Sequence, residues 1–350
     1  MAVEIGGMAS LTLGSLQLKS KVILAPLERV SDVGFRRLCF QQGASLTWTE
    51  MVYASDFSRG VSTAVDLVDT HDCETLTGLQ LLIDRTSSKD GWGVDTLKRA
   101  LDKLEEGAAT DRPEWRNIRA IDLNFGCPSP SISKRGAGPA QLRRRSKVRT
   151  IFETLGDWRK STSLPMIGAV GAKIRLGANA REQEYKVYLP VAQAAIGCLD
   201  YLVVHARHAK ERSRDPPTWE AIAVIEQSIE PSCSLPIIGN GNIRTAADMA
   251  RITELTGCDG VMVGREAMRN PWALRSLVNG KEDDGYSDKQ ILPSVEQLEF
   301  AIAEYTAWSS CRPAASRYKL FHEDNFERLR SECADHATQA RRQTQELATA

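Results

Sequence analysis

Short, nearly continuous apolar runs alternate with longer amphipathic stretches along most of this chain. The apolar runs are rich in β-branched residues, which is typical of parallel strands buried on both faces. Eight of them occur in order, at Lys21–Ala25, Leu46–Thr49, Thr77–Leu82, Ala120–Asn124, Ala172–Ile174, Tyr201–His205, Pro236–Asn240 and Gly260–Val263. Helical periodicity is found between them, at Asp95–Leu104, Lys147–Arg159, Glu184–Ile196, Glu220–Ile229 and Thr245–Thr256. Eight such units predict an α/β fold, a closed (β/α)8 TIM barrel.

The pattern changes in the C-terminal part of the chain. A polar linker at Gly280–Tyr286 precedes an amphipathic helix predicted at Ser294–Thr306, and a second helical stretch is predicted at Arg317–Arg330. We therefore expect two domains, a barrel at residues 1–280 and a small helical domain at residues 288–350 that includes a polar C-terminal tail.

Polar and charged residues gather at the C-terminal ends of the predicted strands. They are Pro26, Glu28, Glu50, Asn124, Cys127, Lys173, Arg175, His205, Arg207, Asn240, Gly264 and Arg265. In a closed barrel these ends form one face, and that face carries the active site. The fourth strand ends in Asn124-Phe125-Gly126-Cys127-Pro128, which delivers an amide and a thiol into a turn shaped by glycine and proline. A lone cysteine at such a place is otherwise a small buried side chain, so a catalytic thiol competes with a structural one.

The last two strands end in glycine-containing turns. Gly241 and Gly264 allow backbone N–H groups to approach a phosphate, and Arg265 adds a charged donor fork. Tight turns alone would also explain the glycines, but two such turns at the last two strand ends favour a phosphate site. Lys173 ends the fifth strand, where a buried cation needs an anionic partner such as a reduced flavin, unless it reaches solvent. His205 ends the sixth strand, where a structural histidine is the alternative.

Composition narrows the class of protein. The 350 residues are 42% hydrophobic and 26% charged, as in soluble globular proteins, and no apolar run has the roughly 20 residues of a membrane span. The N-terminus has no signal-peptide pattern. Eight cysteines are scattered without a C-x-x-C pair, which argues against a metal site and for a reducing, cytoplasmic location.

The formal net charge is zero, so a polyanion would have to meet a local patch. Two basic runs supply such patches: Lys134, Arg135, Arg143, Arg144, Arg145, Lys147 and Arg149, then Arg207, Lys210, Arg212 and Arg214. A single basic run usually indicates a solvent-exposed helix surface. Two runs that follow strand ends on one face favour a phosphodiester backbone as the partner.

These motifs, taken together and in order, resemble the tRNA-dihydrouridine synthases over about Lys21 to Trp272. The resemblance rests on Ala25-Pro26-Leu27-Glu28, Thr49-Glu50-Met51-Val52, Leu79-Gln80-Leu81, Asn124-Phe125-Gly126-Cys127-Pro128, Gly136-Ala137-Gly138, Lys173-Ile174-Arg175-Leu176-Gly177, His205-Ala206-Arg207, Asn240-Gly241-Asn242 and Gly257-Cys258-Asp259-Gly260-Val261-Met262-Val263-Gly264-Arg265. It implies a barrel with a C-terminal helical domain, tightly bound FMN, NADPH as reductant and reduction of tRNA uridines to 5,6-dihydrouridine. A cytoplasmic monomer is the expected form.

The resemblance also implies roles for particular residues. Cys127 would be the general acid that protonates C5 of the uracil after hydride transfer from the flavin to C6. Flavin contacts would come from Pro26, Leu27, Glu28, Gln80, Lys173, His205, Asn240, Gly241, Asn242, Gly264 and Arg265. The RNA would be contacted by Asn124, at the target base, and by Lys134, Arg135, Arg207, Arg317 and Lys319.

The chain departs from the family pattern at five positions, Leu27, which is a mild change, and Arg29, Ile83, Ala206 and His208. Two other functions therefore remain open. One is an FMN barrel oxidoreductase for a free pyrimidine, as in dihydroorotate dehydrogenases, although a small substrate needs neither the basic runs nor the helical domain. The other is an RNA-binding protein, either without flavin or as a catalytically weakened tRNA-binding flavoprotein.

Overall fold

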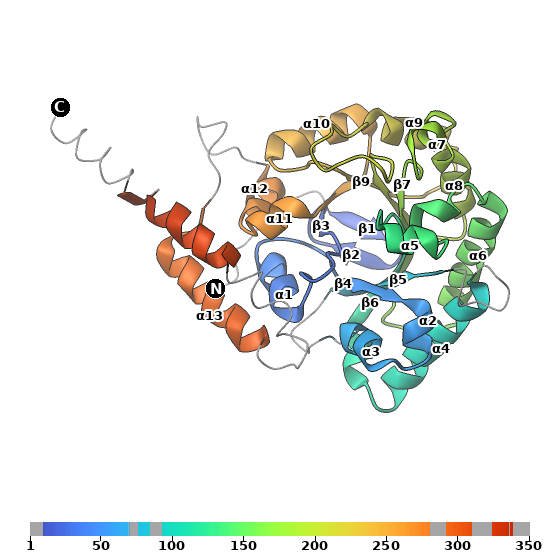
Figure 1. Ribbon diagram of the computed structural model, residues 1–350, viewed down its shortest axis with the longest axis horizontal. Helices are drawn as coiled ribbons and strands as arrows, with labels where there is room; N and C mark the ends of the chain where they lie inside the picture. Colours follow the sequence, from blue (N-terminus) through green and yellow to red (C-terminus); the bar gives the residue numbers. More distant parts are fainter. Residues whose placement is uncertain are drawn as a thin grey trace.

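The computed structural model describes residues 10–68, 70, 76–84, 93–280, 292–309, 324–335 and 337–338. Its main sheet has eight parallel strands in the order β3-β10-β9-β8-β7-β6-β5-β4. The strands are β3 (Val22–Leu24), β4 (Thr47–Tyr53), β5 (Thr77–Leu82), β6 (Ile118–Phe125), β7 (Ala169–Arg175), β8 (Tyr201–His205), β9 (Ile237–Asn240) and β10 (Gly260–Val263). The backbone N–H of Leu24 donates to the carbonyl of Leu46, which closes the sheet between β3 and the start of β4. The predicted TIM barrel is confirmed (Figure 1).

Helices surround this barrel (Figure 1). They are α1 (Val33–Gln41), α2 (Ala54–Ser58), α3 (Ser62–Val68), α4 (Val94–Ala109), α5 (Pro130–Lys134), α6 (Arg145–Ser161), α7 (Ala180–Glu184), α8 (Tyr188–Ala195), α9 (Glu220–Ser228), α10 (Ala246–Thr256), α11 (Arg265–Arg269), α12 (Ala273–Asn279) and α13 (Val295–Ser309), with 3-10 turns η1 (Pro113–Asn117) and η2 (Gly138–Gln141). All eight predicted strands are present. The helix predicted at Glu184–Ile196 is present as α8 but begins later, at Tyr188, because Lys186 has a left-handed φ of 50° and separates α8 from α7.

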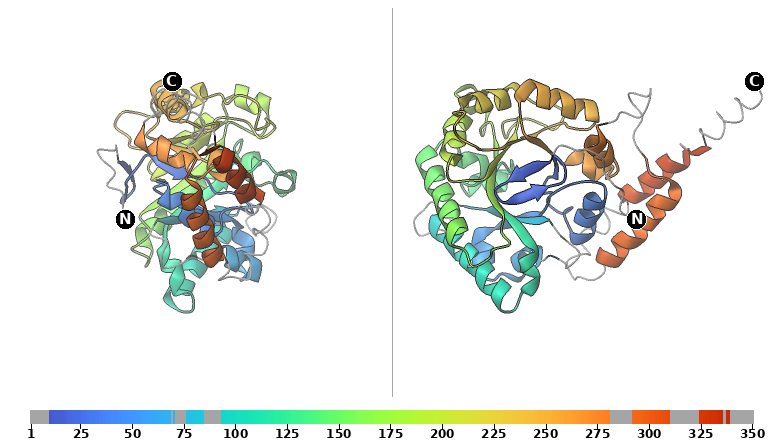
Figure 2. Two further views of the ribbon diagram at one scale, coloured as in Figure 1. Left: turned by 90° about the vertical axis from the view of Figure 1, so that its left-hand side faces the viewer. Right: turned by 180° about the vertical axis from the view of Figure 1, so that it is seen from behind.

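A β-hairpin that the sequence pattern did not reveal lies before the first barrel strand. β1 (Leu11–Leu13) and β2 (Leu16–Leu18) pair antiparallel, and the N–H of Ser15 at their turn donates to the carbonyl of Gly168, just before β7. The hairpin lies across the centre of the ring of strands when the molecule is seen from behind (Figure 2, right). Its four leucines pack against the inward-facing side chains of the barrel, so it covers the end opposite the predicted active site.

The barrel interior has its own core, separate from the larger core between strands and helices. Tyr201 and Trp48 are the large rings of this inner core, with centroids 6.2 Å apart. A Cβ atom at Gly171 would lie 2.2 Å from the Tyr201 ring, so the glycine is required for that ring to fit. The inner core thus forms a solid floor below the C-terminal ends of the strands.

The C-terminal helices pack on one flank of the barrel (Figures 1 and 2). The Tyr305 hydroxyl of α13 donates to Asp32, the N-cap residue of α1, at 2.8 Å. Residues 324–335 are helical, and Phe326 in this segment meets the Tyr305 ring edge-on. The predicted linker at Gly280–Tyr286 lies almost entirely outside the described residues, as do residues 310–323, so the proposed domain division stays a prediction. Within the described chain, no helix is both long and apolar enough to span a membrane.

Candidate active site

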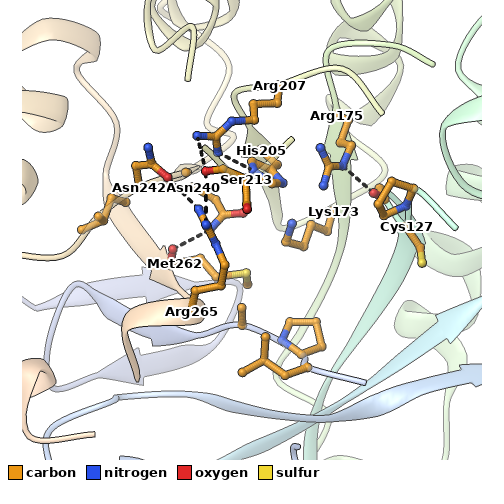
Figure 3. Close-up of a pocket in the computed structure, with 18 of the residues that line it drawn as sticks. Cys127, Lys173, Arg175, His205, Arg207, Ser213, Asn240, Asn242, Met262 and Arg265 are labelled. Atoms are coloured by element: carbon orange, nitrogen blue, oxygen red, sulfur yellow. Dashed lines mark hydrogen bonds between the residues drawn. The ribbon is translucent and has the colours of Figure 1, made fainter. Parts of the chain in front are cut away.

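One cavity of about 620 Å³ opens at the C-terminal ends of the barrel strands. It brings together all of the residues predicted to contact a flavin, together with three of the other predicted site residues. These are Pro26, Leu27, Glu28, Gln80, Lys173, His205, Asn240, Gly241, Asn242, Gly264 and Arg265, then Asn124, Cys127 and Arg207. In Figure 3, Cys127 and Arg265 lie on opposite sides of this space, with Lys173 between them. The cavity therefore has a thiol side and an arginine side.

Cys127 lies on the turn that follows β6 and packs, partly buried, against the apolar cluster of Leu82, Ile132 and Ala137. Burial is the main reason why the pKa of its thiol is raised, and the nearby Glu28 carboxylate raises it further. Arg175 and Lys173 oppose this shift without cancelling it. The thiol is therefore protonated at neutral pH, as a proton donor must be.

Arg175 fixes the position of the thiol-bearing turn. Its Nε donates to the carbonyl of Gly126 at 2.7 Å (Figure 3). Its Nη1 donates to the carbonyl of His208 at 3.2 Å. Two loops that are far apart in the sequence are thus held by one guanidinium. Sequence reasoning placed Arg175 at a strand end but gave it no role, because its carbonyl partners belong to loops after other strands.

Asn124 and Gln80 lie deeper in the cavity. The Asn124 Oδ1 accepts the backbone N–H groups of Gly126 at 3.0 Å and Cys127 at 2.9 Å. Its Nδ2 donates to Gln80 Oε1 at 2.7 Å, and Gln80 Nε2 donates to Asp122 at 2.6 Å. Sequence reasoning missed Asp122, because a single acidic residue inside an apolar strand carries no motif of its own.

Lys173 is the cation at the centre of the cavity. Burial and the nearby Arg175 lower its pKa to about 7, although Asp122 and Cys127 act in the opposite direction. No hydrogen bond or ion pair of the Lys173 ammonium is found among the described residues. Lys173 thus has the environment expected of a cation that meets an anionic ligand.

His205 is neutral in this site. Burial, followed by the charges of Lys173 and Arg175, holds its pKa well below its ordinary value. The Arg207 guanidinium lies 3.3 Å from His205 Nε2 and can only donate, so Nε2 accepts and the ring proton is on Nδ1.

The arginine side of the cavity is formed by the turns after β9 and β10. Gly241 has a φ of 132°, and a Cβ atom there would lie 3.3 Å from Pro217 and 3.4 Å from the His205 ring. Asn242 also has a left-handed φ, of 53°. Its Oδ1 accepts from Arg265 at 2.6 Å, and the other Arg265 terminal nitrogen donates to the carbonyl of Ser213 at 3.2 Å (Figure 3). The guanidinium is thus held in place beside two turns that leave backbone open to the cavity.

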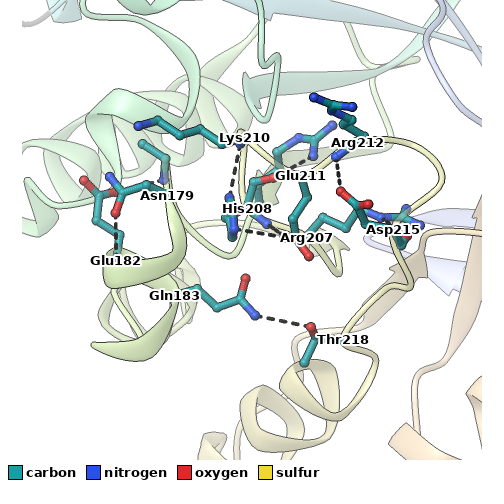
Figure 4. A network of polar contacts seen from close by, with 12 residues as sticks. Asn179, Glu182, Gln183, Arg207, His208, Lys210, Glu211, Arg212, Asp215 and Thr218 are labelled. Carbon is teal, nitrogen blue, oxygen red and sulfur yellow. Dashed lines mark hydrogen bonds and ion pairs between the residues drawn. The ribbon is translucent and has the colours of Figure 1, made fainter.

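Arg207 lies inside the protein, in the loop that follows β8 (Figure 4). Only 1% of it is exposed, and its guanidinium donates to the carbonyls of Asp215 and Ser213. Arg207 therefore supports this loop and faces the cavity instead of an outer surface.

Among the other residues predicted to contact RNA, Lys134 is exposed at the end of α5. Its neighbour Arg135 pairs with Asp84 at 2.7 Å and stacks over the Tyr53 ring, while Arg317 and Lys319 lie outside the described residues.

Arg29, one of the departures from the family pattern, has a left-handed φ of 60°. Its N–H donates to Glu50 at 2.5 Å, which anchors the wall formed by Pro26, Leu27 and Glu28. We expect Arg29→Gly to raise the free energy of unfolding by about 1 kcal/mol. A non-glycine residue with a left-handed φ destabilises the folded state by about 1–3 kcal/mol, and glycine removes this strain. Part of the gain is lost, because glycine increases the conformational entropy of the unfolded chain. Denaturant titration measures this. Arg29→Ala keeps the strained φ and should show no gain; an equal gain in both variants would refute the backbone explanation.

Among the residues that the structure describes, no group of three or more His, Cys, Asp or Glu side chains is placed to hold a metal ion.

Comparison with known proteins agrees with this geometry. The family model described as Dihydrouridine synthase (Dus) matches residues 23–91 and 94–349. A probable tRNA-dihydrouridine synthase of Mycobacterium tuberculosis is 29% identical over 277 residues, which cover 77% of this chain and 64% of that protein. The tRNA-dihydrouridine synthase B of Klebsiella pneumoniae is 28% identical, over 76% of this chain and 73% of that protein. The chain thus spans less than two thirds of the length of the mycobacterial relative.

Solved structures support the fold. Histamine dehydrogenase from Rhizobium sp. 4-9 aligns with a TM-score of 0.55 at 13% identity, over 85% of this chain and 50% of that chain. An old yellow enzyme homologue from Zymomonas mobilis aligns with a TM-score of 0.52 at 13% identity, over 81% of this chain and 99% of that chain. The family model matches most of this chain, including every element that lines the cavity, so the chain belongs to the dihydrouridine synthase family.

Proposed function

We propose that this protein reduces specific uridines of tRNA to 5,6-dihydrouridine with a bound flavin, FMN. The observation that carries the proposal is the pairing, in one cavity, of the protonated Cys127 thiol with the buried ammonium of Lys173, which makes no hydrogen bond or ion pair with the residues that the structure describes. A proton donor opposite an anion-seeking cation suits a reaction in which a hydride and a proton are added to one double bond. Membership of the dihydrouridine synthase family supports the same conclusion.

The cavity fits a flavin phosphate and ring. Gly241 and Gly264 line the cavity where Arg265 is already held in place, which suits a phosphate. Lys173, His205, Gln80, Pro26 and Leu27 all line the cavity. In this proposal Lys173 and His205 would contact the ring, Gln80 its edge, and Pro26 and Leu27 would form the wall beside it. Asn240 supports this end from below, because its Nδ2 donates to the carbonyl of Met262 at 2.6 Å.

When bound, the flavin supplies a hydride to C6 of the uracil, and NADPH is the proposed reductant of the flavin. The residues of this chain do the rest. Cys127 holds the proton for C5, because its raised pKa keeps the thiol protonated until the reaction. Arg175 and Asn124 hold the turn that carries the thiol. Asn124 also faces the cavity, where it would contact the target base.

A base can reach this cavity only after it has left its stack, which costs a few kcal/mol. Basic residues after β6 would offset that cost by binding the tRNA backbone, and Lys134 is the exposed one closest to the thiol in the sequence. We propose that the C-terminal helices form a second tRNA-binding unit, which includes Arg317 and Lys319.

Free thiols at Cys39, Cys127, Cys198, Cys233, Cys258 and Cys333 support a reducing, cytoplasmic location.

The proposal is tested by mapping dihydrouridine in tRNA from cells that lack this gene, followed by complementation with the wild-type gene. Loss of dihydrouridine at one or more positions, restored by the gene, is the expected result. Unchanged tRNA in the absence of any redundant enzyme would refute the proposal. Purified protein that carries yellow flavin but reduces only a free pyrimidine would favour a dihydroorotate dehydrogenase-like activity. Protein that binds tRNA without flavin would instead be an RNA-binding protein.

The C-terminal segment also supports the phosphate end of the cavity. Asn325 donates to the carbonyl of Met268 at 2.6 Å, and Arg328 donates to the carbonyl of Arg269, so both cap α11, which begins with Arg265. We expect the Asn325→Ala, Arg328→Ala double variant to release flavin several-fold faster, because uncapped carbonyls loosen this helix. Flavin fluorescence after dilution measures the release. Arg330→Ala is the control, since the ion pairs of Arg330 among the described residues are with Glu299 and Glu327, within the C-terminal helices. Equal release by both variants would contradict the expectation.

A further inference from the structure

The cavity is lined by more cations than the flavin site accounts for. Seven of its lining residues are cationic and three are acidic. They are Lys173, Arg175, Arg207, Arg212, Arg244, Arg265 and Arg269, against Glu28, Glu211 and Glu266. Four of the cations are accounted for by the flavin ring, the flavin phosphate and the loops that buried guanidinium groups hold in place. The three that remain are Arg212, Arg244 and Arg269.

These three arginines lie on neighbouring loops at one part of the rim. Arg212 follows β8, Arg244 follows β9, and Arg269 ends α11, which follows β10. The strands β8, β9 and β10 are adjacent in the sheet, so the loops at their C-terminal ends meet. Arg269 is four residues beyond Arg265, and residues four apart lie on the same face of a helix.

Arg265 shows how close the loops are to one another. One of its terminal nitrogens donates to the carbonyl of Ser213, the residue after Arg212, at 3.2 Å. The other donates to Asn242 Oδ1 at 2.6 Å, two residues before Arg244 (Figure 3). Arg265 thus bridges the two loops that carry Arg212 and Arg244.

The charges in this part of the rim act on one another. Burial, followed by the charge of Arg244, lowers the pKa of Arg265. Burial raises the pKa of the Glu266 carboxyl, and the charges of Arg269 and Arg244 oppose this shift without cancelling it. In the described part of the chain, no residue forms a hydrogen bond or ion pair with the guanidinium groups of Arg212, Arg244 and Arg269. Cations that crowd together repel, and an anion that enters between them relieves the repulsion.

We infer that Arg212, Arg244 and Arg269 form a second phosphate site at the mouth of the cavity, separate from the flavin phosphate site, for a phosphate ester of a molecule that reacts with the flavin. A guanidinium group suits this ligand, because it presents several N–H donors in a planar fork. The inference rests on the proposed function, in which two such molecules enter the cavity. The tRNA carries backbone phosphates beside the target uridine, and the dinucleotide reductant carries phosphates of its own.

Exposure separates the second site from the first. Asn240 and Gly241, at the flavin phosphate end, are buried, whereas Arg212, Arg244 and Arg269 are exposed. A tightly bound flavin suits the buried position. The exposed position suits a partner that binds and leaves in each catalytic cycle.

The test compares the flavin-bound wild type with the triple variant Arg212→Gln, Arg244→Gln, Arg269→Gln. Three dissociation constants are measured: that of the flavin, that of the target tRNA over a range of salt concentrations, and that of NADPH from anaerobic flavin reduction. Flavin affinity should change little. The affinity for tRNA, for NADPH or for both should fall roughly 10- to 100-fold, the scale of losing hydrogen bonds to a charged group.

The tRNA and NADPH measurements identify the source of the phosphate. If the tRNA supplies it, the affinity for tRNA falls and depends less steeply on salt, because fewer counterions are displaced. If the reductant supplies it, only the affinity for NADPH falls. A loss of both affinities means that the same site serves the two substrates in turn.

The matched control is the triple variant Lys19→Gln, Lys98→Gln, Arg275→Gln, which removes the same charge from exposed positions that do not line the cavity. It should leave all three dissociation constants close to those of the wild type. If it weakens tRNA or NADPH binding as strongly as the test variant does, diffuse charge explains the effect and the inference is wrong.

Two other outcomes would overturn the inference. If flavin binding weakens as much as substrate binding, the three arginines belong to the flavin phosphate site. If neither tRNA nor NADPH binding changes, there is no second phosphate site. Failure of the proposed function is seen separately, because the wild-type protein would then reduce no tRNA uridine.

Discussion

Cys127→Ala is expected to lower the rate of dihydrouridine formation by roughly 100-fold or more, the scale of losing a general acid. The thiol is a partly buried proton donor in the cavity, and an alanine side chain has no proton to donate. Flavin and tRNA binding should change little, because the turn is held by Arg175 and Asn124 through backbone atoms that alanine retains. Single-turnover reduction of tRNA measures the rate, and flavin absorbance measures cofactor content.

The pH dependence of the wild type follows from the same thiol. A general acid works in its protonated form, so activity is present below the pKa of Cys127 and is lost as the pH rises through it. Burial raises that pKa above its ordinary value of 9.0, so the loss should begin only in alkaline solution. Cys233→Ala is the matched control, because Cys233 is a partly exposed thiol that does not line the cavity. Equal turnover by Cys127→Ala and Cys233→Ala would remove Cys127 from the proposed role.

Lys173→Met is expected to stabilise the flavin-free protein by about 1–4 kcal/mol at neutral pH, while it weakens flavin binding. Methionine fills a similar volume without the cost of burying a cation that has no hydrogen-bonded partner in the described part of the chain. Part of the gain is lost, because Asp122 no longer has a nearby positive charge to favour its ionised form. Flavin should bind more weakly, because the electron-rich ring loses its cationic neighbour. Thermal or denaturant unfolding of flavin-free protein measures stability, and flavin titration measures affinity.

The sign of the pH effect separates this explanation from a change in packing. The pKa of Lys173 is lowered from 10.5 to about 7 in the folded protein. Between these two pH values the amine is mostly protonated in the unfolded chain and mostly neutral in the folded protein. The destabilisation is therefore complete below pH 7 and disappears as the pH rises toward 10.5. The stability difference between Lys173→Met and the wild type should shrink over that interval. A stability difference that stays constant with pH would contradict the buried-charge explanation. Lys210→Met is the control: Lys210 is an exposed lysine on the same face, so this change should leave the stability unchanged.

The barrel strands were predictable because their signal is local. Each is a short apolar run bounded by polar residues, and the predicted ranges at Thr77–Leu82, Tyr201–His205 and Gly260–Val263 agree with the structure residue for residue. The β1–β2 hairpin was missed because its strands of three residues are too short to show a period. Its place across the barrel depends on contacts with Gly168 and the inner core, which no local pattern encodes.

The sequence by itself determined which side chains stand at the C-terminal ends of the strands, because strand direction follows from the order of the βα units. Cys127, Lys173 and Arg265 belong to one cavity for that reason. Only the tertiary structure decided what each side chain touches, because this depends on the register between neighbouring strands. Pairing Gln80 beside Asp122 creates the hydrogen-bond chain to Asn124, and the return of the loop after β8 buries the guanidinium of Arg207. Register and loop path are set by long-range packing, so such partners are fixed only once the whole barrel has closed.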